Sequence, residues 1–252
     1  MSEIDPGHDP GTDTATIGMR VPRVFTGQRL SPGADIDLDQ RAARYLSQVL
    51  RRRVGERVTL FDGSGADFDA ELTRCDRKTC SARIVAVCRE EAVPDLQLQL
   101  GIGISRGERM DFAIQKSVEL GVMAITPLLT ERSQVRFRNG RQERRVAHWL
   151  GVLLSACEQS GRSRVPAMHP PDTLQSWLTG HHGGLMLDQR ATCTLSGLAP
   201  PGETLNMLVG PEGGLSDAER SLASNAAFTA VRLGPRVLRT ETAPLAALAA
   251  VQ

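Results

Sequence analysis

Two short glycine-containing loops near the C-terminus have the composition of a ligand-binding site. The first, residues 210–214, follows the apolar run 205–209, and the second begins at Gly234 after the run 230–233. Glycine lets a backbone approach a ligand closely, and the prolines in both loops restrict their shape. If both runs are strands of one parallel sheet, the loops lie at the edge where α/β proteins bind ligands. The alternative for either loop is an ordinary turn.

The second loop is followed by polar side chains at the start of an apolar helix. Arginine, threonine and glutamate occupy positions 236 and 239–242, just before the run 243–251. Thr240 or Thr242 can cap that helix. A cap explains one of these residues and not the whole set, so the sequence predicts a binding function for this segment.

Other patterns argue against metal and nucleotide sites. Residues 101–107 come close to the dinucleotide fingerprint, but Arg106 stands at the third glycine position and no acidic residue follows at the required place. The five histidines show no metal-ligand spacing, so we expect no metal. The cysteines are odd in number and form no C-x-x-C pair, which predicts reduced thiols. They are Cys75, Cys80, Cys88, Cys157 and Cys193.

Composition predicts a globular, cytoplasmic chain with no membrane contact. No apolar run in the 252 residues approaches the roughly 20 needed to cross a bilayer, and no signal-peptide pattern is present. Residues 1–17 are acidic and lack an apolar period, which predicts a disordered tail and leaves the rest mildly basic. Nearly all positive charge is arginine, which suits phosphate recognition, although a GC-rich genome has the same effect.

The pattern of elements predicts two domains. Residues 18–91 indicate a small β-rich domain: a helix over 41–51 with Ala42, Tyr45, Leu46, Val49 and Leu50 on one face, a hairpin around the turn 62–65, and a strand over 79–87. From residue 95 strands alternate with helices, which predicts an α/β domain with a mostly parallel sheet to residue 252. Strands are predicted at 96–104, 124–129, 185–187, 205–209 and 230–233, and helices at 108–120, 142–159, 217–225 and 243–251.

Several separated blocks of residues precede the two glycine loops along the chain. The blocks are Met19-Arg20, Arg23-Val24-Phe25, Leu50-Arg51 with Gly55, Phe61-Asp62-Gly63, Lys116 with Glu119-Leu120-Gly121, Glu131-Arg132-Ser133 and Glu158-Gln159-Ser160-Gly161-Arg162. With these blocks in family order, the sequence from Met19 to its end resembles the bacterial 16S rRNA (uracil-N3)-methyltransferases of the RsmE type, in the SPOUT class. This resemblance implies a trefoil-knotted methyltransferase domain behind an N-terminal PUA-like β-barrel domain. Spacing alone does not predict a knot.

The resemblance implies that S-adenosyl-L-methionine is the cofactor. The cofactor is a cationic sulfonium, so Glu212 or Glu241 would favour it electrostatically unless that carboxylate is a satisfied structural group. The implied cofactor-binding residues are Leu187, Gly210, Glu212, Gly213, Gly214, Leu233, Gly234, Leu238, Arg239 and Thr240.

The implied reaction methylates N3 of a specific uridine, an imide nitrogen that must lose its proton. Glu158 as base and Arg162 as stabiliser of negative charge on the base oxygens supply the two groups needed. Four residues apart, they share a face if helical geometry persists, and the alternative is a surface pair before a helix stop at Gly161. The arginines expected to contact RNA phosphates are Arg23, Arg51, Arg52, Arg53, Arg132 and Arg136.

The resemblance also implies the partners: 16S rRNA within the small ribosomal subunit, and a second copy in a homodimer formed through the knotted domain. Two alternatives stay open. One is a SPOUT methyltransferase acting on tRNA or another RNA. The other is a non-catalytic RNA-binding ribosome assembly factor, against which the intact glycine loops and residues 239–242 argue.

Overall fold

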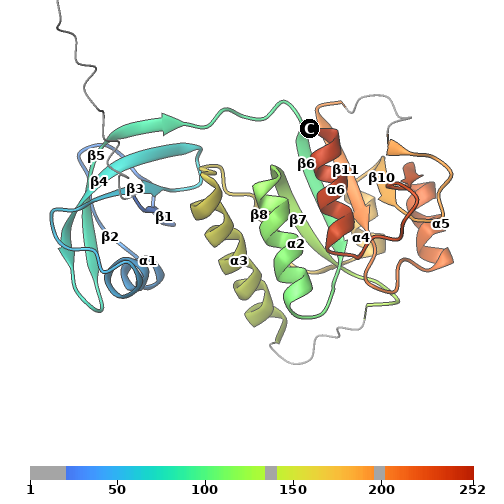
Figure 1. Cartoon of the computed structure of the whole chain (residues 1–252), viewed down its shortest axis with the longest axis horizontal. Coiled ribbons are helices and arrows are strands. Elements are labelled where there is room, and N and C mark those ends of the chain that lie inside the picture. Colours follow the sequence, from blue (N-terminus) through green and yellow to red (C-terminus); the bar gives the residue numbers. More distant parts are fainter. Residues whose placement is uncertain (1–20, 134–140, 196–201) are drawn as a thin grey trace, which may run out of the picture.

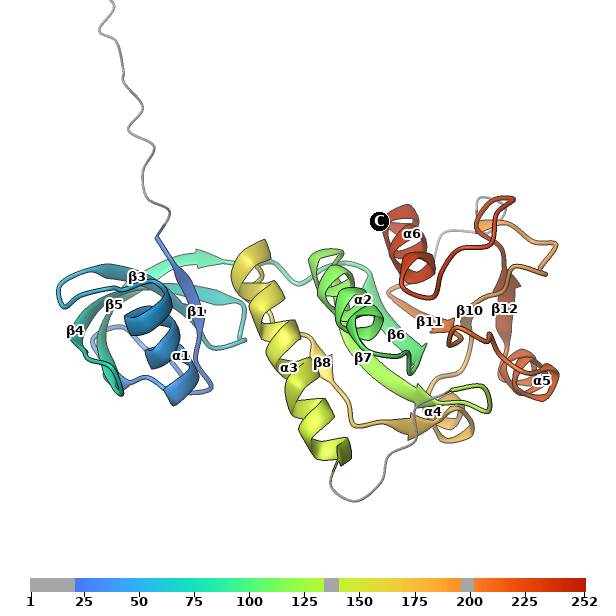
Figure 2. The same cartoon turned by 60° about the horizontal axis from the view of Figure 1, so that its bottom comes forward.

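The computed structural model describes residues 21–133, 141–195 and 202–252. These residues form two units, each built on its own sheet and its own hydrophobic core. Helix α3 (Arg141–Ser160) lies between the two units in both views (Figure 1, Figure 2). The predicted tail, residues 1–17, falls outside the described residues.

The N-terminal unit is a five-stranded sheet with a short helix packed against it. Its strands are hydrogen bonded in the order β1-β3-β4-β5-β2. Helix α1 (Gln40–Arg44) begins after Asp39, whose side chain accepts a hydrogen bond from the Ala42 N–H at 2.8 Å, and it continues as a π-helical segment, Tyr45–Val49. The strands are β1 (Arg23–Phe25), β2 (Asp35–Asp37), β3 (Arg57–Phe61), β4 (Ala66–Cys75) and β5 (Cys80–Glu90).

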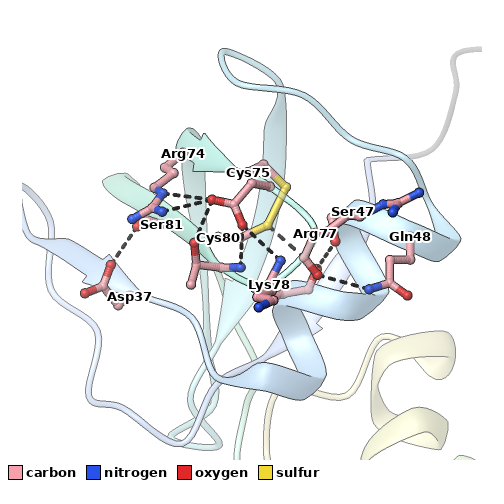
Figure 3. The surroundings of a disulfide bond; sticks show 12 residues. Asp37, Ser47, Gln48, Arg74, Cys75, Arg77, Lys78, Cys80 and Ser81 are labelled. Atoms are coloured by element: carbon pink, nitrogen blue, oxygen red, sulfur yellow. Dashed lines mark hydrogen bonds and ion pairs between the residues drawn. A yellow bond between two sulfur atoms is a disulfide. The ribbon is translucent and has the colours of Figure 1, made fainter.

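Two hairpins build this sheet, and the second carries a disulfide bond. The predicted hairpin around residues 62–65 is confirmed, since β3 and β4 pair antiparallel on either side of it. In the next hairpin the register of β4 and β5 sets Cys75 opposite Cys80, and the two are bonded (Figure 3). The expectation of reduced thiols is therefore wrong for this pair. The remaining cysteines are free: Cys88, Cys157 and Cys193.

The C-terminal unit is a three-layer α/β structure around a seven-stranded sheet. All its strand pairings are parallel, in the order β12-β10-β11-β6-β7-β8, with β9 also on β7. Helices α2, α3 and α6 pack on one face, and α4 and α5 on the other (Figure 2). The strands are β6 (Gln97–Gly103), β7 (Val122–Leu129), β8 (Ala167–Met168), β9 (Asp172–Thr173), β10 (Gly184–Leu187), β11 (Thr204–Val209) and β12 (Phe228–Val231). The remaining helices are α2 (Glu108–Glu119), α4 (Leu174–Gly180), α5 (Asp217–Asn225) and α6 (Thr242–Val251).

The predicted elements of this unit are confirmed with small shifts. Helix α5 has the predicted bounds because Ser216 and Glu219 each accept a hydrogen bond from the other's backbone N–H, which fixes its start. Strand β12 begins at Phe228, two residues before the predicted position. The short elements β1, β2, β8, β9 and α4 were not predicted, because runs of two to seven residues carry little periodic signal.

Candidate functional site

The two glycine loops lie together at the carboxyl edge of the seven-stranded sheet. Strands β10, β11 and β12 are parallel neighbours, so the segments that follow them reach the same edge. With the segment that leads into α6 they surround a cavity of about 350 Å³. The predicted meeting of the two loops is therefore confirmed.

Nine of the ten residues predicted to contact a cofactor line this cavity. They are Leu187, Gly210, Glu212, Gly213, Gly214, Leu233, Gly234, Leu238 and Thr240. Arg239 is the exception, because it does not line the cavity, and its contact with the cofactor stays a prediction. Its side chain is 77% exposed and lies 3.9 Å from the Glu241 carboxylate. Its neighbours on both sides face the cavity, so the Arg239 side chain points away.

Residues 188–190 form a further segment of the cavity wall, which the sequence analysis did not predict. It follows β10 directly, and the Asp188 N–H donates to the Val231 carbonyl at 2.9 Å. The Asp188 carboxylate lies 3.7 Å from the Arg190 guanidinium and 3.6 Å from that of Arg220. This segment follows the carboxyl end of a parallel strand, as the two glycine loops do. The rule that located those loops would therefore have located this segment in the sequence as well.

Glu212 joins the cavity to the connection between β6 and α2. Its Oε1 accepts a hydrogen bond from the Arg106 N–H at 3.1 Å and lies 3.5 Å from the Arg109 guanidinium. Its Oε2 is buried and has no hydrogen-bond partner among the described residues. A buried carboxylate oxygen without a donor is costly. A ligand that brings a hydroxyl, an amine or a positive charge into the cavity therefore fits this site.

Glu158, the predicted base, lies between the two units and does not line this cavity. Its Oε1 accepts hydrogen bonds from the Phe25 N–H at 3.0 Å and from Arg41 Nη2 at 2.8 Å, and its Oε2 accepts one from Arg41 Nη1 at 3.2 Å. The side chain is 10% exposed and borders a groove between the units. A carboxylate held by a two-bonded guanidinium is strongly positioned, and this one attaches β1 and α1 to α3.

Glu158 and Arg162 do not share a face, which corrects the predicted geometry. Helix α3 ends before Gly161, whose φ of +85° is a left-handed conformation that stops helical spacing. The Arg162 guanidinium is buried and donates to the carbonyl oxygens of Val118 at 3.0 Å and Val122 at 2.6 Å. These bonds connect the end of α2 and the start of β7 to the segment after α3.

Two of the arginines predicted to bind RNA, Arg23 and Arg52, also make contacts within the protein. Arg23 is 16% exposed, pairs with Asp67 at 2.7 Å and has its guanidinium 4.6 Å from the centre of the Phe61 ring. Arg52 is 14% exposed and pairs with Glu56 at 3.3 Å. Both residues nevertheless border the groove between the two units, so their contacts with RNA stay a prediction.

The other predicted RNA contacts are exposed or lie outside the described residues. Arg51 and Arg53 are exposed just after the π-helical segment. Arg132 is exposed at the rim of the cavity and donates to the Gly213 carbonyl at 3.0 Å. Arg136 falls in the undescribed residues 134–140.

Neither a metal centre nor a membrane span is found in the described part of the chain. No group of three or more His, Cys, Asp or Glu side chains there is placed to hold a metal ion. None of the helices in the same ranges is long and apolar enough to cross a membrane.

Comparison with known families places the chain with this fold and cavity among the RNA methyltransferases. Residues 92–252 match the RNA methyltransferase domain, and residues 38–85 match the RNA methyltransferase PUA domain. The Ribosomal RNA small subunit methyltransferase E of Buchnera aphidicola (Schizaphis graminum) is 31% identical over 92% of this chain and 96% of its own length. The chain belongs to the ribosomal RNA small subunit methyltransferase E family, which confirms the resemblance seen in the sequence.

Two solved structures are similar over nearly the whole chain. The family member from Neisseria gonorrhoeae, bound to S-adenosyl methionine, is 41% identical with a TM-score of 0.84, covering 91% of this chain and 96% of its own. A methyltransferase from Legionella pneumophila with bound cofactor SAM is 36% identical with a TM-score of 0.89, covering 92% and 97%. The predicted combination of an α/β methyltransferase domain with a PUA domain is therefore confirmed, whereas the trefoil knot stays a prediction.

Proposed function

We propose that this protein transfers a methyl group from S-adenosylmethionine to N3 of a specific uridine in 16S rRNA. The observation that carries the proposal is the cavity at the sheet edge, where nine of the ten residues predicted for the cofactor meet beside the unpartnered Glu212 oxygen. The relatives support it, because two are named for the ribosomal small subunit and two were solved with the cofactor.

S-adenosylmethionine, when bound, supplies a methyl group carried on a positively charged sulfur. The glycine loops offer backbone groups to its adenosine part, and Glu212 favours its positive charge or accepts one of its hydrogen bonds. The uridine N3 proton must leave before or during attack. Glu158 is the proposed base, and Arg162 the proposed stabiliser of negative charge on the uracil oxygens. The hydrogen bonds of the two side chains within the protein give a competing explanation, in which Glu158 and Arg162 serve the structure and not the reaction.

Replacing Glu158 by glutamine tests the proposed base. We expect single-turnover methyl transfer to slow about 100-fold, with cofactor affinity unchanged, because the amide cannot take the N3 proton. Rapid-quench assays at saturating cofactor measure the rate, and calorimetry measures affinity and unfolding. Glu108→Gln is the matched control, since Glu108 is exposed and borders the same groove. A wild-type rate with a lower unfolding temperature would leave Glu158 only as a contact between the units.

We also propose how the protein meets its RNA. Residues 18–91 form the RNA-binding domain, and exposed Arg51 and Arg53 contribute phosphate contacts. A groove of about 1180 Å³ between the two units is the proposed path of the nucleic-acid strand. The enzyme acts in the cytoplasm on the small ribosomal subunit, as a homodimer formed through its knotted domain, residues 95–252.

Nucleoside mapping tests the proposed function as a whole. In a strain that lacks this protein, N3-methyluridine is expected to disappear from 16S rRNA and to return when the gene is restored. Persistence of the modified nucleoside would contradict the proposal. Loss of a methylated nucleoside from tRNA would favour the tRNA alternative. If calorimetry finds no cofactor binding, the non-catalytic assembly factor is favoured.

A further inference from the structure

The turn that links β6 to the start of α2, residues 105–109 with the first residues of the helix included, contacts the cavity loop 210–214 through Glu212 and has no role in the proposed function. Strand β6 pairs in parallel with β11, with Ile102 opposite Val209, so this turn and the loop 210–214 leave the sheet side by side. A Cβ built on Gly103 would lie 2.4 Å from the Pro211 nitrogen, so the two backbones are in direct contact. The turn is therefore fixed against the wall of the cavity.

Glu212 holds the turn from the cavity side. One carboxylate oxygen accepts the Arg106 N–H at 3.1 Å and faces the Arg109 guanidinium at 3.5 Å. Ser105, at the start of the turn, is 3% exposed, whereas Arg106 and Arg109 are both exposed. The backbone of the turn is thus anchored while its cationic side chains reach solvent.

Arg106 is left available for an external partner. Its guanidinium has no hydrogen bond or ion pair with the residues that the structure describes, whereas Arg109 is near Glu212. Arg132 adds an exposed cation at the rim of the same cavity. Positive side chains do not favour a positively charged cofactor, because like charges repel. A cationic rim around this cavity suits an anionic partner, and a guanidinium is well shaped to hold phosphate oxygens through paired hydrogen bonds.

We propose that Arg106 binds a backbone phosphate next to the target uridine at the mouth of the cofactor cavity, with Glu212 and Arg109 fixing the turn. This inference rests on the proposed function, because it requires an RNA substrate. A phosphate contact of this kind sets the position of the nucleotide and does not read its base. Arg106 is therefore a positioning residue for the methyl acceptor.

Replacing Arg106 by alanine tests the inference in the full-length protein. With small subunits isolated from the deletion strain, the RNA concentration for half-maximal rate is expected to rise about tenfold. The slope of log affinity against log salt is expected to fall by about one, because one phosphate contact is lost. Cofactor affinity and the rate at saturating RNA stay at wild-type values. Arg106→Lys is expected to keep the salt slope and recover part of the affinity.

Arg144→Ala is the matched control, since it also removes one exposed arginine from the same unit. Arg144 lies on α3 and lines neither the cavity nor the groove. If Arg106→Ala binds RNA with wild-type affinity and salt slope, the inference is wrong, and methyl transfer by the wild-type protein still supports the proposed function. If the wild-type protein methylates no subunits, the proposed function fails. The inference is then tested separately by comparing equilibrium RNA binding of Arg106→Ala with that of the wild-type protein.

Discussion

Replacing Gly103 by alanine is expected to abolish methyl transfer, although Gly103 does not line the cofactor cavity. The added Cβ would lie 2.4 Å from the Pro211 nitrogen and 2.9 Å from the Gly210 carbonyl carbon. These atoms belong to backbone and cannot rotate away. Strand β6 cannot retreat either, because it is hydrogen bonded to β11 on one side and β7 on the other. The loop 210–214 must therefore move, and with it one wall of the cavity.

Cofactor calorimetry and single-turnover assays measure this effect. Overpacking at Gly103 is also expected to lower the free energy of unfolding by about 1–3 kcal/mol. Gly151→Ala is the matched control, because Gly151 lies inside α3 with no atom within 4 Å of its added Cβ. That control is expected to stabilise the protein by about 0.5–1 kcal/mol, since alanine is the better helix former. Wild-type cofactor affinity in Gly103→Ala would contradict the proposed role of this backbone contact.

Local chemistry explains which parts of the fold could be predicted. Helix α5 begins where Ser216 and Glu219, three positions apart, each accept a hydrogen bond from the other's backbone N–H. This start can therefore be predicted from the sequence. Val49 shows the opposite case. Helical spacing predicted that it is buried beside Leu46, but Val49 is 67% exposed. The Leu50 N–H bonds to the Tyr45 carbonyl five residues back, and this π-helical turn shifts the later side chains around the axis.

The same distinction holds for the candidate site. The two glycine loops could be predicted to meet because they follow parallel strands, whose carboxyl ends lie at one edge of the sheet, whereas the individual cavity residues came from the family resemblance. The surroundings of Glu158 could not be predicted, since Arg41 lies 117 positions away in sequence and meets it only through the packing of the two units. The disulfide could not be predicted either, because only the register of β4 with β5 sets Cys75 opposite Cys80.

Replacing Asp67 by alanine is expected to lower the free energy of unfolding by about 3 kcal/mol, because it removes one partner of a buried ion pair. The Asp67 side chain is 5% exposed, and its Oδ1 accepts hydrogen bonds from Arg23 at 2.7 Å and from Ser163 at 2.6 Å. Its Oδ2 accepts one from Arg89 at 2.8 Å. Without this carboxylate the Arg23 guanidinium stays enclosed with an unpaired charge, and the N-terminal sheet loses one of its hydrogen bonds to the segment after α3.

The loss is expected to depend on pH. Burial opposes ionisation of Asp67, but hydrogen bonds from Arg23, Ser163 and Arg89 outweigh it and lower the pKa of the carboxyl below its ordinary value. A carboxyl whose pKa is lower in the folded state stabilises the fold above the unfolded value of about 4, and this contribution disappears as the pH falls through the folded pKa. The difference in stability between the wild-type protein and Asp67→Ala is therefore full at neutral pH and shrinks in acid.

Denaturant unfolding at neutral and acidic pH measures this difference, with Asp35→Ala as the matched control. Asp35 also takes two hydrogen bonds from an arginine, Arg83, but its side chain is 57% exposed, so its removal is expected to change stability little. If the two variants lose the same free energy of unfolding, the burial of Asp67 does not increase its contribution to stability. Because Asp67 lies in the N-terminal unit and does not line the cavity, Asp67→Ala is expected to keep cofactor affinity while methyl transfer to small subunits falls. A parallel loss of cofactor binding would mean that the contacts between the units also shape the cavity.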